Sequence, residues 1–125
     1  MTAGRWIVDG MNVIGSRPTG WWRDRLGAMR DLVELLDAFA GREGDEVTVV
    51  FDGRPFDLDS PRVGVRFASR RGRNAADDDI AALVARDAEP ASLSVVTSDS
   101  DLARRVRERG AAVVGAGEFR RRLDG

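Results

Sequence analysis

Residues 7–15 of this chain read IVDGMNVIG, and here an apolar run meets a carboxylate. The run ends abruptly at Asp9, and Gly10 and Asn12 follow before apolar character returns. A carboxylate directly after an apolar strand is either a turn former or part of an active site. The pattern along the rest of the chain is needed to choose between these two interpretations.

Short apolar runs along the chain predict buried strands, and apolar residues spaced by three and four predict helices between them. The predicted strands cover residues 5–8, 47–51, 63–67, 93–97 and 112–114. The predicted helices cover residues 22–40, 76–87, 99–109 and 117–123. The link 52–62 contains Pro55 and Pro61 and is too short and broken for a helix. Apolar strands alternating with helices favour an α/β fold with a mostly parallel sheet covered on both faces.

The composition excludes several kinds of chemistry. The 125 residues, 42% of them hydrophobic, suit one domain spanning 1–125, and the formal net charge is -1. The chain has no Cys, no His and no Lys, so all 20 basic residues are Arg. Zinc sites of thiolate or imidazole, disulfides, Ser-His nucleophiles and a P-loop Lys are therefore excluded. Any catalysis would rest on carboxylates and hydroxyls, with a metal ion that prefers oxygen ligands, such as Mg²⁺ or Mn²⁺.

The location of the protein is also predicted from the sequence. The apolar runs are too short to span a bilayer, and the N-terminus lacks a signal-peptide pattern. We therefore expect a cytoplasmic protein without a membrane partner.

Carboxylates follow three different predicted strands. Asp9 ends the first strand, Asp52 follows the second, and Asp99 and Asp101 follow the fourth, while Asp77 opens a helix. The carboxyl ends of parallel strands share one edge of the sheet, where such folds bind ligands. Turn formation or helix capping explains each acid alone. Capping does not explain acids after three strands, and crowded carboxylates repel one another unless a cation lies among them. The pattern predicts a metal site.

Helical geometry selects among the three acids that open the helix over 76–87. Asp77 is in line with Ile80 and Val84, which must face the core, so we expect it nearest the sheet. Asp78 and Asp79 are rotated away, and Asp78 is the alternative.

The motifs VDGMNVI, VVFDG, NAADDDIAALV and VVTSDSDL, in this order, resemble the NYN branch of the PIN-like nuclease superfamily, and most closely its YacP-type subgroup. The resemblance covers residues 5 to about 115. It implies a three-layer α/β/α sandwich whose five-stranded, mostly parallel sheet has the order 3-2-1-4-5. It also implies metal-dependent hydrolysis of RNA phosphodiester bonds by a ribonuclease, with endonuclease and exonuclease action both open.

The resemblance also implies roles for individual residues. Asp9 matches the acid after the first strand, and Asn12 matches the Asn that follows it. Asp77 matches the helix acid, and Asp99 and Asp101 match the last acidic pair. These five residues form the predicted catalytic set, and its acids are the predicted ligands of one or two Mg²⁺ or Mn²⁺ ions. A water activated by the metal would attack the phosphorus, so the mechanism requires no His.

Three features are less typical of the family. Asp52 matches an acid present in only part of the superfamily and is a lower-ranked ligand. YacP-type chains usually carry a Glu where this chain has Ala81, and their C-terminal tail is longer. The last two differences favour an alternative: a catalytically weakened or inactive PIN-like module that binds RNA or a protein.

Binding of RNA beside an acidic edge requires positive charge. The segment 62–74, RVGVRFASRRGRN, is rich in Arg and lacks acids, and a Trp pair follows the first acid. A solvated edge strand and core packing are the alternative explanations. The predicted RNA-binding residues are Arg66, Arg70, Arg71, Arg73, Trp21 and Trp22. We expect the RNA to be single-stranded, because Trp stacks on unpaired bases. The sequence leaves open whether the protein forms a homo-oligomer or binds a protein partner.

Three other folds with acidic sheet edges fit less well. A HAD-type phosphatase needs a second Asp where this chain has Met11, together with a Lys. A receiver domain could use Asp52 as the phosphoacceptor, but it needs an acidic pair after the first strand and a late Lys. A Toprim site needs Glu at the position of Asp9.

Overall fold

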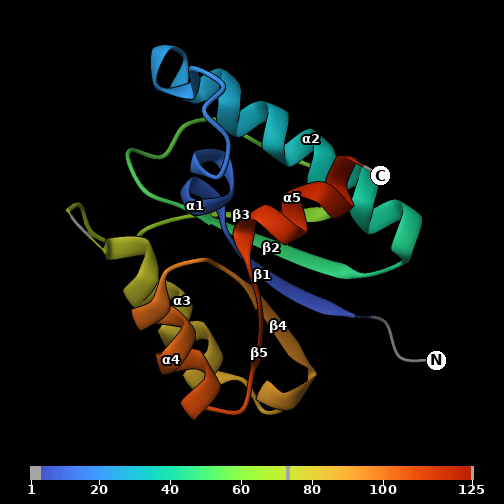
Figure 1. Ribbon diagram of the computed structural model, residues 1–125, viewed down its shortest axis with the longest axis vertical. Coiled ribbons are helices and arrows are strands. Elements are labelled where there is room, and N and C mark those ends of the chain that lie inside the picture. Colours follow the sequence, from blue (N-terminus) through green and yellow to red (C-terminus); the bar gives the residue numbers. More distant parts are fainter. Residues whose placement is uncertain (1–3, 73, 125) are drawn as a thin grey trace.

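The computed structural model describes residues 4–72 and 74–124, in which strands and helices alternate along the chain (Figure 1). The strands are β1 (Arg5–Asp9), β2 (Glu46–Phe51), β3 (Val63–Phe67), β4 (Leu93–Val96) and β5 (Ala112–Val114). The helices are α1 (Gly10–Gly15), α2 (Arg25–Glu43), α3 (Ala75–Arg86), α4 (Ser100–Glu108) and α5 (Ala116–Asp124). Two 3₁₀ turns, η1 (Trp21–Arg23) and η2 (Pro90–Ser92), precede α2 and β4.

The strands form a five-stranded sheet in the order β3-β2-β1-β4-β5. Every pairing along it is parallel. The predicted α/β class, the parallel sheet and the order 3-2-1-4-5 are therefore confirmed. Strand order reverses between β1 and β4, so the carboxyl ends of these two neighbouring strands lie side by side at the switch point.

Helices cover both faces of the sheet, which makes the predicted three-layer sandwich. Figure 1 shows α1, α2 and α5 on one face and α3 and α4 on the other. Val8 of β1 belongs to the apolar core under α1, α2 and α5. Its neighbour Ile7 belongs to the second core, under α3 and α4, because successive side chains of a strand point to opposite faces. Burial on both faces explains why the central strands are continuous apolar runs.

Every predicted strand is present, with its ends within one residue of the prediction. The predicted helix over 22–40 is wrong at both ends, since α2 begins and ends three residues later. The Asp24 side chain caps its start by accepting a hydrogen bond of 3.0 Å from the Gly27 N–H, after the separate turn η1. Gly44, with a left-handed φ of 69°, ends it.

Helix α1 was not predicted, because its six residues GMNVIG are too few to display a helical period. It begins directly after β1 and turns the chain away from the sheet edge. A glycine is needed at its first position, since a Cβ on Gly10 would lie 2.4 Å from the Phe51 ring. This close packing places the end of β1 beside the end of β2.

The link between β2 and β3 contains no helix, as expected, and it still crosses one face of the sheet. Phe56 and Leu58 of this link pack against the core under α2 and replace the apolar face of a crossover helix. Across residues 4–72 and 74–124, no helix combines the length and the apolar character that crossing a membrane requires.

Candidate active site

Four carboxylates lie at the carboxyl edge of the sheet, each delivered by a different element. Asp9 is the last residue of β1, Asp52 directly follows β2, Asp77 lies in the first turn of α3, and Asp99 is the N-cap of α4. We call these four residues the acidic cluster. The parallel sheet and the helices that follow its strands bring them to one edge.

The charges of the acidic cluster act on one another. The pKa of Asp9 is raised to about 7, mainly by burial and in part by the charges of Asp77 and Asp52. The pKa of Asp77 is raised to about 6, mainly by burial and in part by the charges of Asp99 and Asp52. The protein therefore holds negative charge here at a cost in free energy, which is typical of a functional site.

Asp9 is the most buried acid, with 4% of its surface exposed. The Thr97 hydroxyl donates a hydrogen bond of 3.0 Å to Asp9 Oδ2 and accepts one of 3.1 Å from the Asp99 N–H. Thr97 thereby joins two members of the cluster, and sequence reasoning assigned it no role. Its only local signal is a polar residue at the end of an apolar run, which also occurs in ordinary turns.

Two members of the cluster also cap helices. Asp52 Oδ1 accepts a hydrogen bond of 3.0 Å from the Ala76 N–H at the start of α3. Asp99 Oδ1 accepts one of 2.9 Å from the Leu102 N–H in α4. Capping and a place in the cluster are therefore compatible, because each carboxylate has a second oxygen.

Two residues of the predicted catalytic set have different surroundings. Asp101 has 71% of its side chain exposed and pairs with Arg104 at 2.8 Å, so the structure does not bring it to the cluster. Asn12 Oδ1 accepts a hydrogen bond of 2.8 Å from the Ser98 N–H. Asn12 thus holds the turn between β4 and Asp99 against α1.

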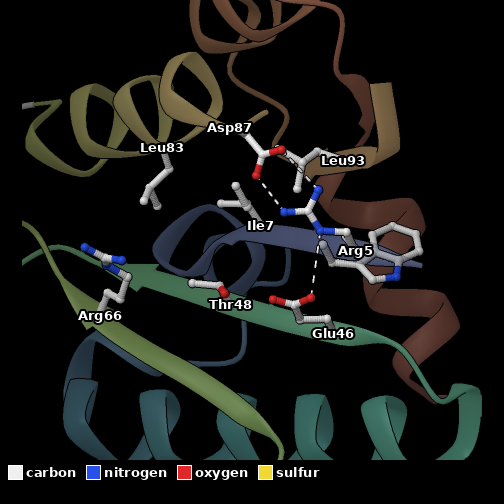
Figure 2. Close-up of a pocket in the computed structure, with 9 residues that line it drawn as sticks. Arg5, Ile7, Glu46, Thr48, Arg66, Leu83, Asp87 and Leu93 are labelled. Atoms are coloured by element: carbon white, nitrogen blue, oxygen red, sulfur yellow. Dashed lines mark hydrogen bonds and ion pairs between the residues drawn. The ribbon is translucent and has the colours of Figure 1, made fainter. Parts of the chain in front are cut away.

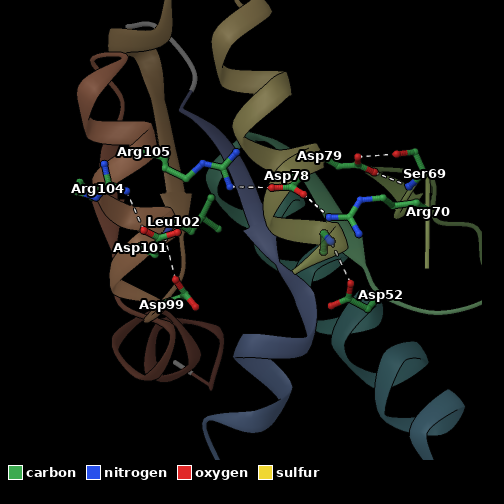
Figure 3. A network of polar contacts seen from close by, with 11 residues as sticks. Asp52, Ser69, Arg70, Asp78, Asp79, Asp99, Asp101, Leu102, Arg104 and Arg105 are labelled. Carbon is green, nitrogen blue, oxygen red and sulfur yellow. Dashed lines mark hydrogen bonds and ion pairs between the residues drawn. The ribbon is translucent and has the colours of Figure 1, made fainter. Parts of the chain in front are cut away.

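The other two acids of α3 bind the loop that precedes the helix (Figure 3). Asp78 pairs with Arg70 and, at 2.9 Å, with Arg105 of α4. Asp79 accepts hydrogen bonds of 2.6 and 2.7 Å from the backbone and hydroxyl of Ser69. Asp77 is the acid of α3 whose charge acts on Asp9.

The residues predicted to bind RNA are dispersed. Arg66 lines a cavity of about 120 Å³ on the α3 side of the sheet, together with Thr48 and Leu83 (Figure 2). No member of the acidic cluster lines this cavity in the described part of the chain. Arg70 and Arg71 are exposed in the loop before α3.

The remaining predicted RNA contacts differ in exposure. Trp21 packs partly against the core, whereas Trp22 is 58% exposed. Their rings meet edge to face with centroids 5.9 Å apart. Arg73 lies outside the described residues.

The chemistry of the donor set, considered apart from its geometry, suits a hard divalent cation. All four clustered side chains offer carboxylate oxygens, the ligands that Mg²⁺ and Mn²⁺ prefer. The raised pKa values of Asp9 and Asp77 mark negative charge that a cation would stabilise. Over the described residues, no three Asp or Glu side chains converge closely enough to surround a metal ion.

Known proteins share this architecture. The family model of the YacP-like NYN domain matches residues 6–125. A crystal structure of a point mutant of Rae1 (YacP) from Bacillus subtilis is similar with a TM-score of 0.82 and 26% identity, over 97% of this chain and 75% of that one. The crystal structure of Rae1 (YacP) from Bacillus subtilis without the mutation has a TM-score of 0.78 and 26% identity. This match covers 99% of the present chain and 74% of the Rae1 chain. No curated protein sequence matches. With nearly its whole length matched, the chain belongs to the YacP-like NYN domain family of PIN-like nucleases.

Proposed function

We propose that this protein is a metal-dependent ribonuclease that hydrolyses RNA phosphodiester bonds at the acidic cluster. The observation that carries the proposal is the delivery of four carboxylates to one edge of the sheet by four different elements. Burial and neighbouring carboxylates raise the pKa values of Asp9 and Asp77 there to about 7 and about 6. Membership of a PIN-like nuclease family supports the same reaction class.

Asp9, Asp77 and Asp99 are the proposed ligands of Mg²⁺ or Mn²⁺, with Asp52 beside them. When bound, the ion supplies an activated water and stabilises the charge that develops at the phosphate. Thr97 keeps the Asp9 carboxylate oriented through its hydrogen bond.

Two further contacts position the proposed ligands. Asn12 fixes the turn that carries Asp99, through its hydrogen bond to Ser98. Asp52 fixes the start of α3, one residue before Asp77. Asp101 has no place in this arrangement, because it faces solvent and Arg104.

The proposed substrate is single-stranded RNA. Arg70 and Arg71 place positive charge in the loop directly before α3, and contacts from Arg to phosphates supply sequence-independent affinity. The exposed ring of Trp22 offers a surface on which an unpaired base stacks, worth about 1–3 kcal/mol.

The decisive experiment follows cleavage of an end-labelled single-stranded RNA with Mn²⁺, with Mg²⁺ and with EDTA. We expect cleavage only with a divalent metal, and a loss of at least about 100-fold in Asp9→Asn and Asp77→Asn. Asp57→Asn is the matched control, because it removes the same charge from an exposed position in the link between β2 and β3. Equal cleavage by all three variants would refute the assignment of the site.

A non-catalytic RNA-binding module is the second candidate. It is favoured by Ala81, one helical turn after Asp77, where the subgroup usually has a carboxylate. Titration of Mn²⁺ against the melting temperature separates the candidates. A metal site gains about 2.7 kcal/mol at 100 times its Kd, and Asp77→Asn with Asp99→Asn abolishes that gain. RNA binding without metal stabilisation or cleavage would establish the second candidate.

A further inference from the structure

One carboxylate next to the acidic cluster holds two arginines. Arg105 Nη1 of α4 contacts Asp78 Oδ1 at 2.9 Å, and Arg70 Nη2 from the loop before α3 contacts the other oxygen, Oδ2 (Figure 3). The two guanidinium groups therefore lie on either side of Asp78. We call these three residues the arginine bridge.

The arginine bridge keeps a net positive charge that reaches solvent. One carboxylate neutralises one of the two guanidinium groups, and each group has five N–H donors, of which the bridge engages one. The side chains of Arg70 and Arg105 are 53% and 35% exposed. Both therefore have donors to offer to a further anion.

The arginine bridge lies directly beside the proposed site. Asp78 directly follows Asp77 in α3, and its contact of 2.9 Å with Arg105 brings this guanidinium to the start of the same helix. Arg105 and Asp78 also line a hollow of about 280 Å³ between α3 and α4, together with Ala81, Ala82 and Ala85 of α3. Glu108 and Arg109 line it as well, and Glu108 pairs with Arg104 at 3.0 Å. The small alanine side chains leave room for a ligand beside Arg105.

We propose that Arg70 and Arg105 bind backbone phosphates of the RNA next to the bond that is cut, and that Asp78 is the residue that positions them. This inference rests on the proposed function, since it concerns the same RNA. Guanidinium groups bind phosphate oxygens through paired hydrogen bonds. Asp78 restricts both side chains before RNA arrives, which reduces the entropy lost on binding.

The competing explanation is that the bridge only ties α3 to α4. Two variants separate these roles. Asp78→Asn weakens the same contacts but leaves both positive charges, whereas Arg105→Gln removes one charge. Arg107→Gln, at an exposed position of α4 two residues further on, is the control for net charge.

The test measures binding of a fluorescent single-stranded RNA by anisotropy in EDTA, between about 50 and 200 mM NaCl. We expect Arg105→Gln to weaken binding several-fold and to reduce the slope of log K against log salt by about 0.7, the value for one phosphate contact on a single strand. Asp78→Asn is expected to keep the salt slope of the wild type, because both positive charges remain, and to weaken binding less than Arg105→Gln does. Arg105→Lys should keep the slope, and Arg107→Gln should change it far less than Arg105→Gln.

The proposal is overturned if Arg105→Gln and Arg107→Gln behave alike, or if Arg105→Gln and Asp78→Asn lose binding equally along with melting temperature. A wild type that binds no RNA overturns it as well. Cleavage with Mn²⁺ is measured in parallel. Binding that depends on Arg105 in a protein that cleaves nothing would refute the ribonuclease and support the phosphate contact. Cleavage that does not depend on Arg105 would support the ribonuclease and refute the phosphate contact.

Discussion

Replacing Asp9 by Asn should stabilise the metal-free protein at alkaline pH, contrary to the usual effect of changing a buried residue. Asp9 is 4% exposed and its pKa is raised from the ordinary 3.8 to about 7. At about 1.4 kcal/mol for each pKa unit, holding the ionised carboxylate in the folded protein costs about 4 kcal/mol at pH 8. Asn is uncharged and still accepts the hydrogen bond from Thr97.

The sign of the pH dependence follows from proton binding. Between pH 3.8 and about 7, the folded protein keeps the Asp9 proton and the unfolded chain releases it. The folded state then binds more protons, so the free energy of unfolding falls as pH rises through this window. The stability that depends on protonated Asp9 is therefore fully present below pH 3.8 and is lost above the raised pKa of about 7. Asp9→Asn removes the part of this fall that Asp9 causes, whereas Asp77, whose pKa is raised to about 6, causes its own part in both proteins. We expect the advantage of Asp9→Asn over the wild type to grow by about 2–3 kcal/mol from pH 5 to pH 8.

The assay is urea unfolding in EDTA at pH 5 and pH 8, followed by tryptophan fluorescence. Subtracting the free energy of unfolding at pH 8 from that at pH 5 cancels any effect of the substitution that does not depend on pH. Asp57→Asn, at an exposed position, should leave the pH dependence of the wild type unchanged. Parallel curves for Asp9→Asn and the wild type would refute the argument that Asp9 carries an uncompensated charge.

Three further substitutions test single residues in or near the site. Thr97→Val should cost about 1–3 kcal/mol in urea unfolding, because it removes a buried hydroxyl that Asp9 needs. Asp101→Asn should change the free energy of unfolding by less than about 1 kcal/mol, since the side chain is exposed. It should also leave RNA cleavage intact, and a large loss of cleavage would return Asp101 to the metal site. Gly10→Ala should lower the melting temperature, because its Cβ would lie 2.4 Å from the Phe51 ring, with overpacking of this kind costing about 1–3 kcal/mol. An unchanged melting temperature would show that the ring moves freely.

The strands were predictable because their signals are local. The run VTVVF at 47–51 is apolar on both faces, and turn residues bound it. The expected orientation of Asp77 also rested on local geometry, since Ile80 and Val84 are both buried in the core under α3 and α4. The short helix α1 was missed because six residues are too few to display a helical period.

The sequence by itself determined the five strands, the helices α2 to α5, and the acids that follow strands, because apolar periodicity acts over a few residues. Only the tertiary structure decided what each side chain contacts. Asp9 and Thr97 are 88 positions apart in the chain and share a hydrogen bond. Asp99 joins the cluster while Asp101, two positions later, turns to solvent, since the start of α4 rotates the second acid away from the sheet edge. Contacts of this kind depend on how separate strands and helices pack, and no local pattern records that packing.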